Sequence, residues 1–322
     1  MTAFSRRSLL AAPLLADVPA AAQASFPGAR PVTLVMPYTA GGLPTVLGNI
    51  ITQGLAQRLG GSFVTDFRPG AATAIAARQV ARAQPDGHTL LFGSVTTFAA
   101  VPHAQRNPGY DPLADFHHLT MIGNTLFMLV GHPRWPSLAA VLEEARRRPG
   151  QLSYASFGIG STAHLVMVDF LRRAGVEMLH IPFGGSGPAI TEILAGRVDL
   201  MFPTFASAKP HVEAGRLQGF GVPARNRIPS MPAVPTLSEL GFTDFHFDAW
   251  LGVSAPAGTP PAVAEALEAA LVATFAEATT RARLEELGLE PAPPGRAAMV
   301  ASIRRNLDAN RELMARAGIT PE

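Results

Sequence analysis

Four segments of this chain share one order: an apolar strand, a loop rich in Gly, Ser and Thr, and then a helix. The clearest loop lies between Ile181 and Ala189, with glycines at positions 184, 185 and 187 and a proline at 188. Proline suits the first turn of a helix, because its missing N–H would have no partner there. Glycines let the backbone approach a ligand, and free N–H groups at a helix N-terminus favour an anion. None of the four loops carries Asp, Glu, Cys or Lys, so we expect a protein that holds an anion rather than one that transforms it.

Strands and helices alternate along the chain, which predicts an α/β fold with mostly parallel sheets flanked by helices. A second series of elements begins at Phe127, and three helices without strands follow Pro261. A run of helices cannot build a third domain, so we expect these to pack back on the first sheet. The predicted lobes are residues 25–124 plus 247–322, and residues 125–246. Two crossings between them would form a hinge, with a ligand in the cleft.

The expected elements follow from hydrophobic periodicity and turn residues. Thr45 is expected to cap the first helix. The expected strands are 32–36, 63–66, 89–92, 127–130, 152–155, 178–181, 198–202, 218–222 and 250–253. The expected helices are 45–59, 72–82, 137–148, 162–174, 188–195, 261–276, 278–287 and 296–317.

The N-terminus is typical of an export signal. Arg6 and Arg7 precede an apolar stretch, and Ala22-Gln23-Ala24 is typical of a cleavage site. Residues 1–24 are therefore predicted to be removed on export, by either the twin-arginine or the general secretion route. The chain has no Cys, which excludes disulfides, thiolate metal sites and a lipid anchor on Cys. We expect a monomer free in the periplasm.

The charge pattern and the histidines exclude other partners. The net charge is +2, and no cluster of bases is interleaved with aromatic residues, so no nucleic-acid partner is expected. The nine histidines are scattered without a metal-binding spacing, and we predict no metal and no cofactor. Residues 158–163 read G-x-G-x-x-A, as in a dinucleotide site. However, the acid Glu177 falls at the beginning of the next strand, where it could not serve such a site.

The four loops and one strand end supply the candidate ligand-binding residues. For each segment a structural interpretation stays open: a plain glycine turn, local capping by hydroxyls, a satisfied structural histidine, or a buried strand end. The candidates, in chain order, are Tyr38, Thr39, Gly41, Gly42, Ser94, Thr96, Thr97, Ser156, Thr162, His164, Phe183, Gly184, Gly185, Ser186, Ala189, Pro203 and Thr204.

Several motifs in order carry a resemblance to a known family. They are Pro37-Tyr38 with Gly41-Gly42, Arg68-Pro69-Gly70-Ala71, Pro85 to Leu91, Tyr110 to Phe116, Tyr154-Ala155-Ser156 with His164-Leu165, Ile181 to Ser186, and Pro256 to Pro260. Over about residues 27–319 the chain resembles the Bug/TctC family, periplasmic solute-binding receptors of tripartite tricarboxylate-type transporters. The resemblance implies a two-lobed periplasmic-binding-protein fold (Venus flytrap, type II), a small carboxylate ligand and membrane transporter subunits as partners. It also implies that the first and fourth loops grip one carboxylate.

The chain departs from the family pattern at three places. The first loop usually ends Gly-Gly-Gly-Thr-Asp, but here reads 41–45 Gly-Gly-Leu-Pro-Thr. Positions 72–74 read Ala-Thr-Ala instead of Gly-Gly-Asn, and Pro203 stands where Asp or Asn is common. Each change makes the cleft less polar. We therefore expect a ligand with one carboxylate and an apolar or aromatic body.

Two other functions remain open from the sequence. A periplasmic sensor that signals its ligand state to a partner would share every feature above. An exported hydrolase could use Ser186 or Ser161 with His164, but it would need an acid to orient the base, and no loop supplies one. We therefore expect no enzymatic activity.

Overall fold

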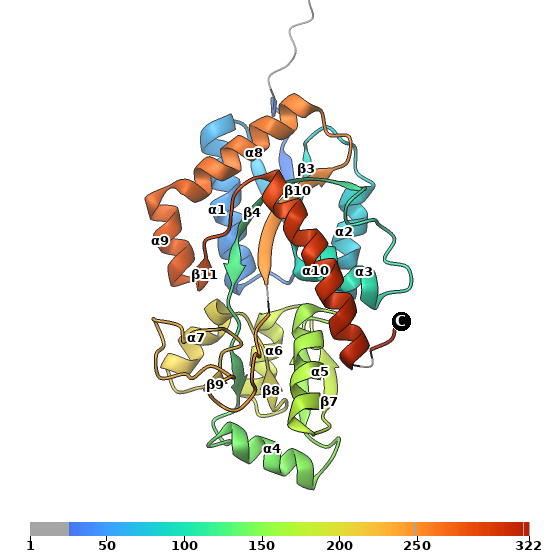
Figure 1. Cartoon of the computed structure of the whole chain (residues 1–322). Coiled ribbons are helices and arrows are strands. Elements are labelled where there is room, and N and C mark those ends of the chain that lie inside the picture. Colours follow the sequence, from blue (N-terminus) through green and yellow to red (C-terminus); the bar gives the residue numbers. More distant parts are fainter. Residues whose placement is uncertain (1–25, 248, 318, 322) are drawn as a thin grey trace, which may run out of the picture.

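The computed structural model describes residues 26–247, 249–317 and 319–321, and the export signal predicted for residues 1–24 lies outside them. Figure 1 shows two lobes, with the N-terminal and C-terminal helices on one lobe and the middle of the chain forming the other. Within the described residues, no helix combines the length and the apolar character needed to cross a lipid bilayer.

The first lobe is built on a six-stranded sheet in the order β11-β4-β10-β3-β1-β2. β1 pairs in parallel with β2 and β3, whereas β10 lies antiparallel between β3 and β4. β1 to β4 therefore share one direction, as the prediction of a mostly parallel sheet requires, and β10 and β11 oppose them. The strands are β1 (Val32–Met36), β2 (Phe63–Phe67), β3 (Thr89–Ser94), β4 (Phe116–Thr125), β10 (Trp250–Pro256) and β11 (Leu289–Glu290).

The second lobe is built on a five-stranded sheet in the order β7-β6-β8-β5-β9. β6 pairs in parallel with β7 and β8, and β5 lies antiparallel between β8 and β9. In each sheet, one strand lies next to a segment that connects the lobes and runs antiparallel to both of its neighbours. This strand is β10 in the first sheet and β5 in the second. The strands are β5 (Leu129–Gly131), β6 (Ser153–Ser156), β7 (Leu179–Pro182), β8 (Leu200–Met201) and β9 (Gln218–Gly221).

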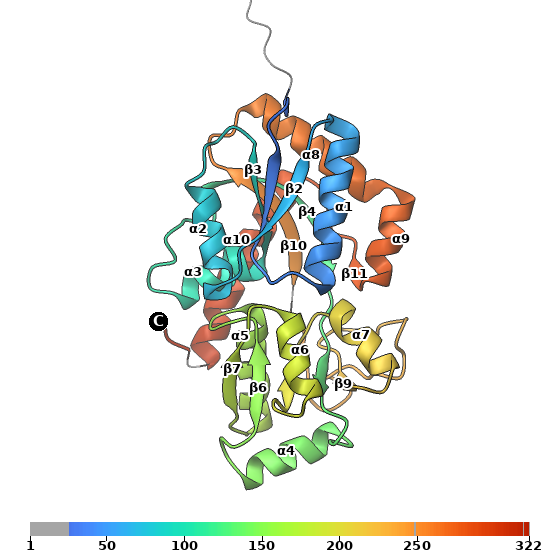
Figure 2. The same ribbon diagram turned by 180° about the vertical axis from the view of Figure 1, so that it is seen from behind.

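Helices cover both faces of the first sheet because its strands are apolar on both sides. Leu34 of β1 packs in one core with α1 (Gly42–Leu59) and α8 (Pro261–Ala276). The next residue, Val35, packs in the opposite core with α2 (Ala74–Ala81) and α10 (Arg296–Ala317). The prediction that the C-terminal helices pack back on the first sheet is confirmed (Figures 1 and 2). Helix α9 (Ala278–Glu286) joins α8 to β11.

Four helices surround the second sheet and share one hydrophobic core with it. Amphipathic patterns in the sequence predicted three of these helices, α4, α5 and α6, whereas α7 was not expected. The helices are α4 (Leu138–Arg147), α5 (Thr162–Ala174), α6 (Ser186–Leu194) and α7 (Phe205–Glu213).

Two extended segments connect the lobes, and a third element reaches across beside them. The segments after β4 and before β10 lie side by side, where the backbone N–H of Thr125 donates to the carbonyl of Ala249 at 2.6 Å. The C-terminal half of α10 extends to α5, where Met314 packs with Leu165 (Figure 1). The two crossings match the predicted hinge, while the predicted domain boundaries themselves stay a prediction.

The structure corrects two local expectations. Helix α1 begins at Gly42 with Gly41 at its N-cap, so Thr45 is not the cap. Instead the hydroxyl of Thr45 accepts a hydrogen bond from the N–H of Gly41 at 2.7 Å. Thr96 and Thr97, expected in the loop 93–97, begin a π-helical turn (Thr96–Ala100) that is followed by α3 (Val101–Ala104). β-branched residues such as Thr96 disfavour helices locally, and the complete burial of Phe98 overrides that preference.

Candidate ligand-binding site between the lobes

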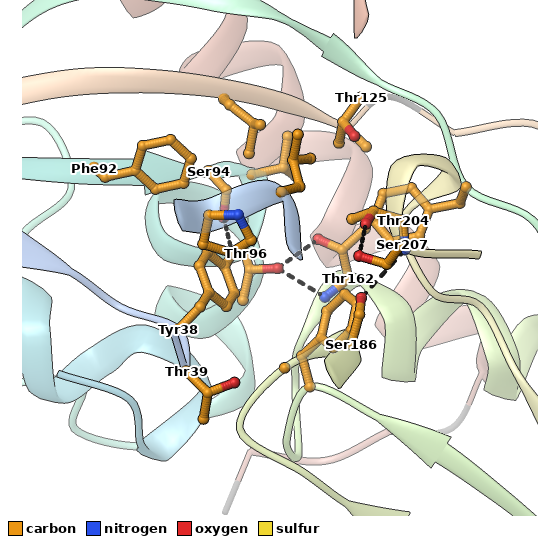
Figure 3. A pocket seen from close by; sticks show the side chains of 18 of the residues that line it. Tyr38, Thr39, Phe92, Ser94, Thr96, Thr125, Thr162, Ser186, Thr204 and Ser207 are labelled. Carbon is orange, nitrogen blue, oxygen red and sulfur yellow. Dashed lines mark hydrogen bonds between the residues drawn. The ribbon is translucent and has the colours of Figure 1, made fainter. Parts of the chain in front are cut away.

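A cavity of about 50 Å³ lies between the lobes, where the ends of β1 and β3 face the N-termini of α6 and α7. We call it the inter-lobe pocket, and Figure 3 shows it from close by. Its lining comes from both lobes and is mostly apolar. The lining residues are Tyr38, Thr39, Gly41, Leu43, Pro44, Phe92, Ser94, Val95, Thr96, Thr125, Phe127, Phe157, Thr162, Gly185, Ser186, Gly187, Thr204, Ser207, Ala249, Trp250 and Leu251.

The structure brings nine of the predicted site residues together around this pocket. They arrive from four loops and a strand end that are distant in sequence, because each precedes a helix at the lobe interface. The nine are Tyr38, Thr39, Gly41, Ser94, Thr96, Thr162, Gly185, Ser186 and Thr204. Their role in binding stays a prediction.

Other predicted residues stand behind the lining and hold local structure. The side chain of Thr97 is fully buried, and its hydroxyl accepts from the N–H of Ser94 at 3.3 Å. Ser156 is also fully buried, with its Oγ 2.6 Å from Nε2 of His180. The Nδ1 of His164 accepts from the N–H of Gly160 at 3.1 Å, as expected of a satisfied structural histidine.

The remaining predicted residues contribute backbone or border a different opening. Gly42 begins α1 beside the pocket, and Ala189 is buried within α6. The carbonyl of Pro203 accepts from the N–H of Met128 at 3.2 Å. Phe183 and Gly184 line a second opening between the lobes rather than the pocket itself.

Sequence reasoning missed the aromatic walls of the pocket. Phe92 lies inside β3, Phe127 at the hinge and Trp250 at the beginning of β10. These residues sit within apolar strands, so nothing in the local pattern separates them from ordinary core. The hydroxyl of Ser207 was missed because it lies on helix α7, which was not expected from the sequence.

Three helix N-termini face the pocket and give it an electropositive character. Residues at the beginning of α1, α6 and α7 line it, and no side chain caps any of the three N-termini. Uncapped N-termini leave backbone N–H groups without intrahelical partners, and the helix dipoles place partial positive charge there. At α7 one of these groups, the N–H of Phe205, already donates to the carbonyl of Leu126 at 2.8 Å. Among the residues that the structure describes, the lining contains no Asp, Glu, Lys, Arg or His. The pocket can therefore attract one negative charge without supplying a cation.

Hydroxyl groups add a polar network to this backbone array. The Oη of Tyr38 lies 2.9 Å from Oγ of Ser94. Thr204 donates to Oγ of Ser207 at 2.9 Å (Figure 3). Burial raises the pKa of Tyr38 to about 12, so its phenol stays neutral near pH 7. Neutral hydroxyls can turn to donate to an anion or accept from a ligand hydroxyl.

Direct hydrogen bonds join the two lobes around the pocket. The N–H of Thr39 donates to the carbonyl of Gly184 at 3.2 Å. The hydroxyl of Thr96 donates to Oγ1 of Thr162 at 3.0 Å, and the N–H of Thr162 donates to Oγ1 of Thr96 at 3.1 Å (Figure 3). A Cβ at Gly185 would lie 2.9 Å from the hydroxyl oxygen of Thr39. Because glycine has no Cβ, Gly185 of the second lobe can lie this close to Thr39 of the first lobe.

The residues considered for hydrolysis are not arranged as a nucleophile and base. Oγ of Ser161 accepts from the N–H of His164 at 3.2 Å, as a helix cap. Oγ of Ser186 accepts from the N–H of Thr204 at 3.4 Å. Among the described residues, neither hydroxyl bonds a histidine ring. Burial lowers the pKa of His164 to about 4, and its ring stacks on that of His180 at 4.1 Å.

Two mixed sheets, two crossing segments and a pocket between the lobes define a two-lobed binding-protein fold. Residues 48–318 match the family model TctC, described as tripartite tricarboxylate transporter family receptor. The chain belongs to this family.

Relatives and solved structures are similar to this chain over nearly its whole length. A UPF0065 protein encoded in the tcbD-tcbE intergenic region of Pseudomonas sp. strain P51 is 35% identical, covering 89% of this chain and 87% of the relative. The structure of R. palustris Rpa4515 with adipate has a TM-score of 0.87 at 32% identity, covering 91% of this chain and 99% of the other. The structure of MatC from Rhodopseudomonas palustris with bound malate has a TM-score of 0.84 at 29% identity, covering 88% and 98%.

Proposed function

We propose that this protein is an extracytoplasmic receptor that captures a small carboxylate in the inter-lobe pocket. In this proposal it acts as a monomer in the periplasm and presents the ligand to a tripartite tricarboxylate-type membrane transporter. The observation that carries the proposal is the meeting of three uncapped helix N-termini on a pocket whose described lining has no ionised side chain. A carboxylate supplies both the missing charge and the missing acceptors.

The composition of the lining supports a ligand with one carboxylate and an apolar or aromatic body. Phe92, Phe127, Phe157 and Trp250 form aromatic walls, and the lining, as far as the structure describes it, holds no cation to offset a second buried charge. The two solved structures named above contain adipate and malate, which carry two carboxylates. The replacement of the usual Asp and Asn positions by Thr45, Ala74 and Pro203 supports a difference in ligand between this chain and those relatives.

The size of the cavity limits the ligand to a small acid. A water molecule needs about 10–15 Å³ of such cavity volume, so a cavity of about 50 Å³ favours a compact acid. Charge-assisted hydrogen bonds contribute about 1.5–3 kcal/mol each. A few of them would reach micromolar affinity, about −8 kcal/mol.

Capture would occur by closure of the lobes around the ligand. Hydrogen bonds between Thr39 and Gly184 and between Thr96 and Thr162 form only when the lobes are together. A ligand that touches both lobes favours this closed state, and a membrane partner that reads it can distinguish loaded from empty receptor.

A ligand screen by thermal shift, followed by calorimetry, tests the proposal. The panel comprises aliphatic and aromatic monocarboxylates together with malate, adipate and citrate. We expect one or more monocarboxylates to bind at one site per chain with micromolar affinity, and small-angle scattering to show compaction. A clear preference for citrate or the dicarboxylates would contradict the single-carboxylate assignment. Turnover of a bound acid would contradict the receptor assignment.

A further inference from the structure

Phe157 borders both the inter-lobe pocket and the second opening, which is the larger cavity that Phe183 and Gly184 line. The pocket has a volume of about 50 Å³ and the second opening about 540 Å³. Of the residues that the structure describes, Phe157 alone lines both cavities. The backbone adds to the boundary, because Thr39 lines the pocket, Gly184 lines the second opening, and the N–H of Thr39 donates to the carbonyl of Gly184 at 3.2 Å. Phe157 and this bond therefore separate a small pocket from a much larger cavity.

The ring of Phe157 packs across the boundary between the lobes. Its centroid lies 6.3 Å from that of Tyr38 at an interplanar angle of 76°, and 6.1 Å from that of Phe127. Both partner rings also line the pocket, and Phe157 is 9% exposed. Tyr38 belongs to the first lobe and Phe157 to the second, so their contact forms only when the lobes are together. The ring is therefore a part of the pocket wall that closure completes.

The backbone beside Phe157 is held from two sides. The N–H of Gly158 donates to Oγ of Ser156 at 3.1 Å, and the N–H of Phe183 donates to the carbonyl of Ser156 at 3.0 Å. On the other side, a Cβ at Gly158 would lie 3.3 Å from Cβ of Ala72 in the first lobe. The turn is thus tied to its own sheet and seated against the opposite lobe. It has little room to carry Phe157 aside for a larger ligand.

This position gives Phe157 control over the length of the ligand. A compact acid fits within the pocket and lets Tyr38 and Phe157 meet. A longer acid must enter the space of the ring or hold the lobes apart, and overpacking of this kind is unfavourable. Removal of the ring would join the pocket to the second opening, which has room for the tail of a longer acid. Below the limit, each methylene that is buried should strengthen binding about fourfold.

We propose that Phe157 is a specificity-determining residue that restricts this receptor to short or compact monocarboxylates, because it closes the inter-lobe pocket on the side of the second opening. This assignment rests on the proposed function, which places the carboxylate at the helix N-termini as the fixed end of the ligand. The length of the ligand body is then set by the distance left before the ring of Phe157.

Two series of acids of increasing length test the assignment by calorimetry. One series runs through the linear acids from acetate to decanoate, and the other comprises benzoate and its 4-methyl, 4-propyl and 4-pentyl derivatives. In the wild-type protein, affinity should rise to a limiting length and then fall about tenfold or more. Small-angle scattering should show compaction with acids up to this limit and not beyond it.

Variants of Phe157 should move the limit. In Phe157→Ala the limiting length should increase, and the first acid beyond the wild-type limit should gain about tenfold or more relative to the shorter acids. The ratio between acids is the readout, because loss of the ring contact with Tyr38 weakens every acid. Phe157→Leu should move the limit in the same direction by less. It keeps an apolar side chain in the core and supplies the test if Phe157→Ala does not fold.

Ile159→Ala is the matched control in the same loop. Ile159 lines the second opening but not the inter-lobe pocket, and its side chain is 42% exposed. This variant should keep the limiting length of the wild-type protein. The unfolding midpoints of all variants are measured in parallel, so that a change in stability is distinguished from a change in selectivity.

The outcomes separate this inference from the proposed function. If wild-type affinity keeps rising through both series, or if the limit is the same in both Phe157 variants as in wild type, the inference is wrong although the receptor assignment stands. An equal shift of the limit in Ile159→Ala would also overturn it, because the loop as a whole would then set the length. If no acid of either series binds the wild-type protein, the proposed function fails and this inference falls with it.

Discussion

One added methyl group at Gly185 should hinder closure of the lobes without disturbing either lobe. A Cβ there would lie 2.9 Å from Oγ1 of Thr39 and 3.7 Å from its backbone nitrogen, and Thr39 belongs to the other lobe. The backbone of Gly185 is extended, with φ 163° and ψ −178°, so alanine can adopt it. Gly187, two residues further in the same helix, has no atom within 4 Å of its built Cβ. Gly185→Ala and Gly187→Ala therefore form a matched pair.

The magnitude follows from the contact. Forcing an extra methyl group into a packed site costs about 1–3 kcal/mol. Because the crowding arises between the lobes, this cost falls on the closed state and not on the folding of either lobe. At 1.4 kcal/mol for each factor of ten, ligand affinity should fall about 5- to 150-fold in Gly185→Ala. Gly187 lines the same pocket, so Gly187→Ala serves as the control for folding, and its unfolding midpoint should stay close to that of wild type.

Calorimetry with the tightest-binding monocarboxylate measures these affinities, and small-angle scattering measures compaction on binding. We expect Gly185→Ala to need more ligand to reach the compact state, with an unfolding midpoint in the absence of ligand close to that of wild type. Wild-type affinity in Gly185→Ala, or a lowered unfolding midpoint without ligand that Gly187→Ala does not share, would refute the role assigned to the contact between Thr39 and Gly185.

Two further predictions concern stability. Burial lowers the pKa of both His164 and His180 to about 4, below the usual 6.5. The unfolded chain therefore binds more protons between pH 6.5 and 4, so the free energy of unfolding should fall as pH drops through this window. Partial exposure of the rings limits the loss to on the order of 1–2 kcal/mol. Urea unfolding at pH 7 and pH 4.5 should show a smaller difference in His164→Phe than in wild type, and an unchanged difference would contradict the assignment. Asp199 is 6% exposed and accepts hydrogen bonds from Arg134 and from two N–H donors in the second lobe. Asp199→Ala should cost about 2–3 kcal/mol by urea unfolding, and a loss below 0.5 kcal/mol would show that these bonds add little.

The parts of the site that the sequence predicted are those with a local signature. Tyr38, Thr39, Gly185 and Ser186 stand in loops between a buried strand and a helix, and such loops meet at one edge of a sheet. The helix that follows each loop could also be recognised from its periodicity. That these loops meet at one pocket could therefore be predicted from a single rule, which is that most strands of a lobe run in the same direction.

The parts that the sequence did not predict depend on tertiary contacts. Phe92 and Trp250 belong to apolar strands, and only the meeting of the lobes turns one side of each into a pocket wall. The turn at Thr96 is helical because Phe98 is completely buried, against the local preference of the threonines. The N-cap of α1 is Gly41 rather than Thr45, because the positive φ of 108° at this position suits only glycine.

The measurement that tests the central claim most directly compares one acid with its own amide. The claim is that uncapped helix N-termini, without a cationic side chain, hold a single carboxylate in the inter-lobe pocket. Calorimetry should show that the tightest-binding monocarboxylate loses at least a hundredfold in affinity when its carboxylate is replaced by a primary amide of nearly the same shape. Equal binding of the acid and the amide would contradict the account, because the pocket would then recognise shape alone.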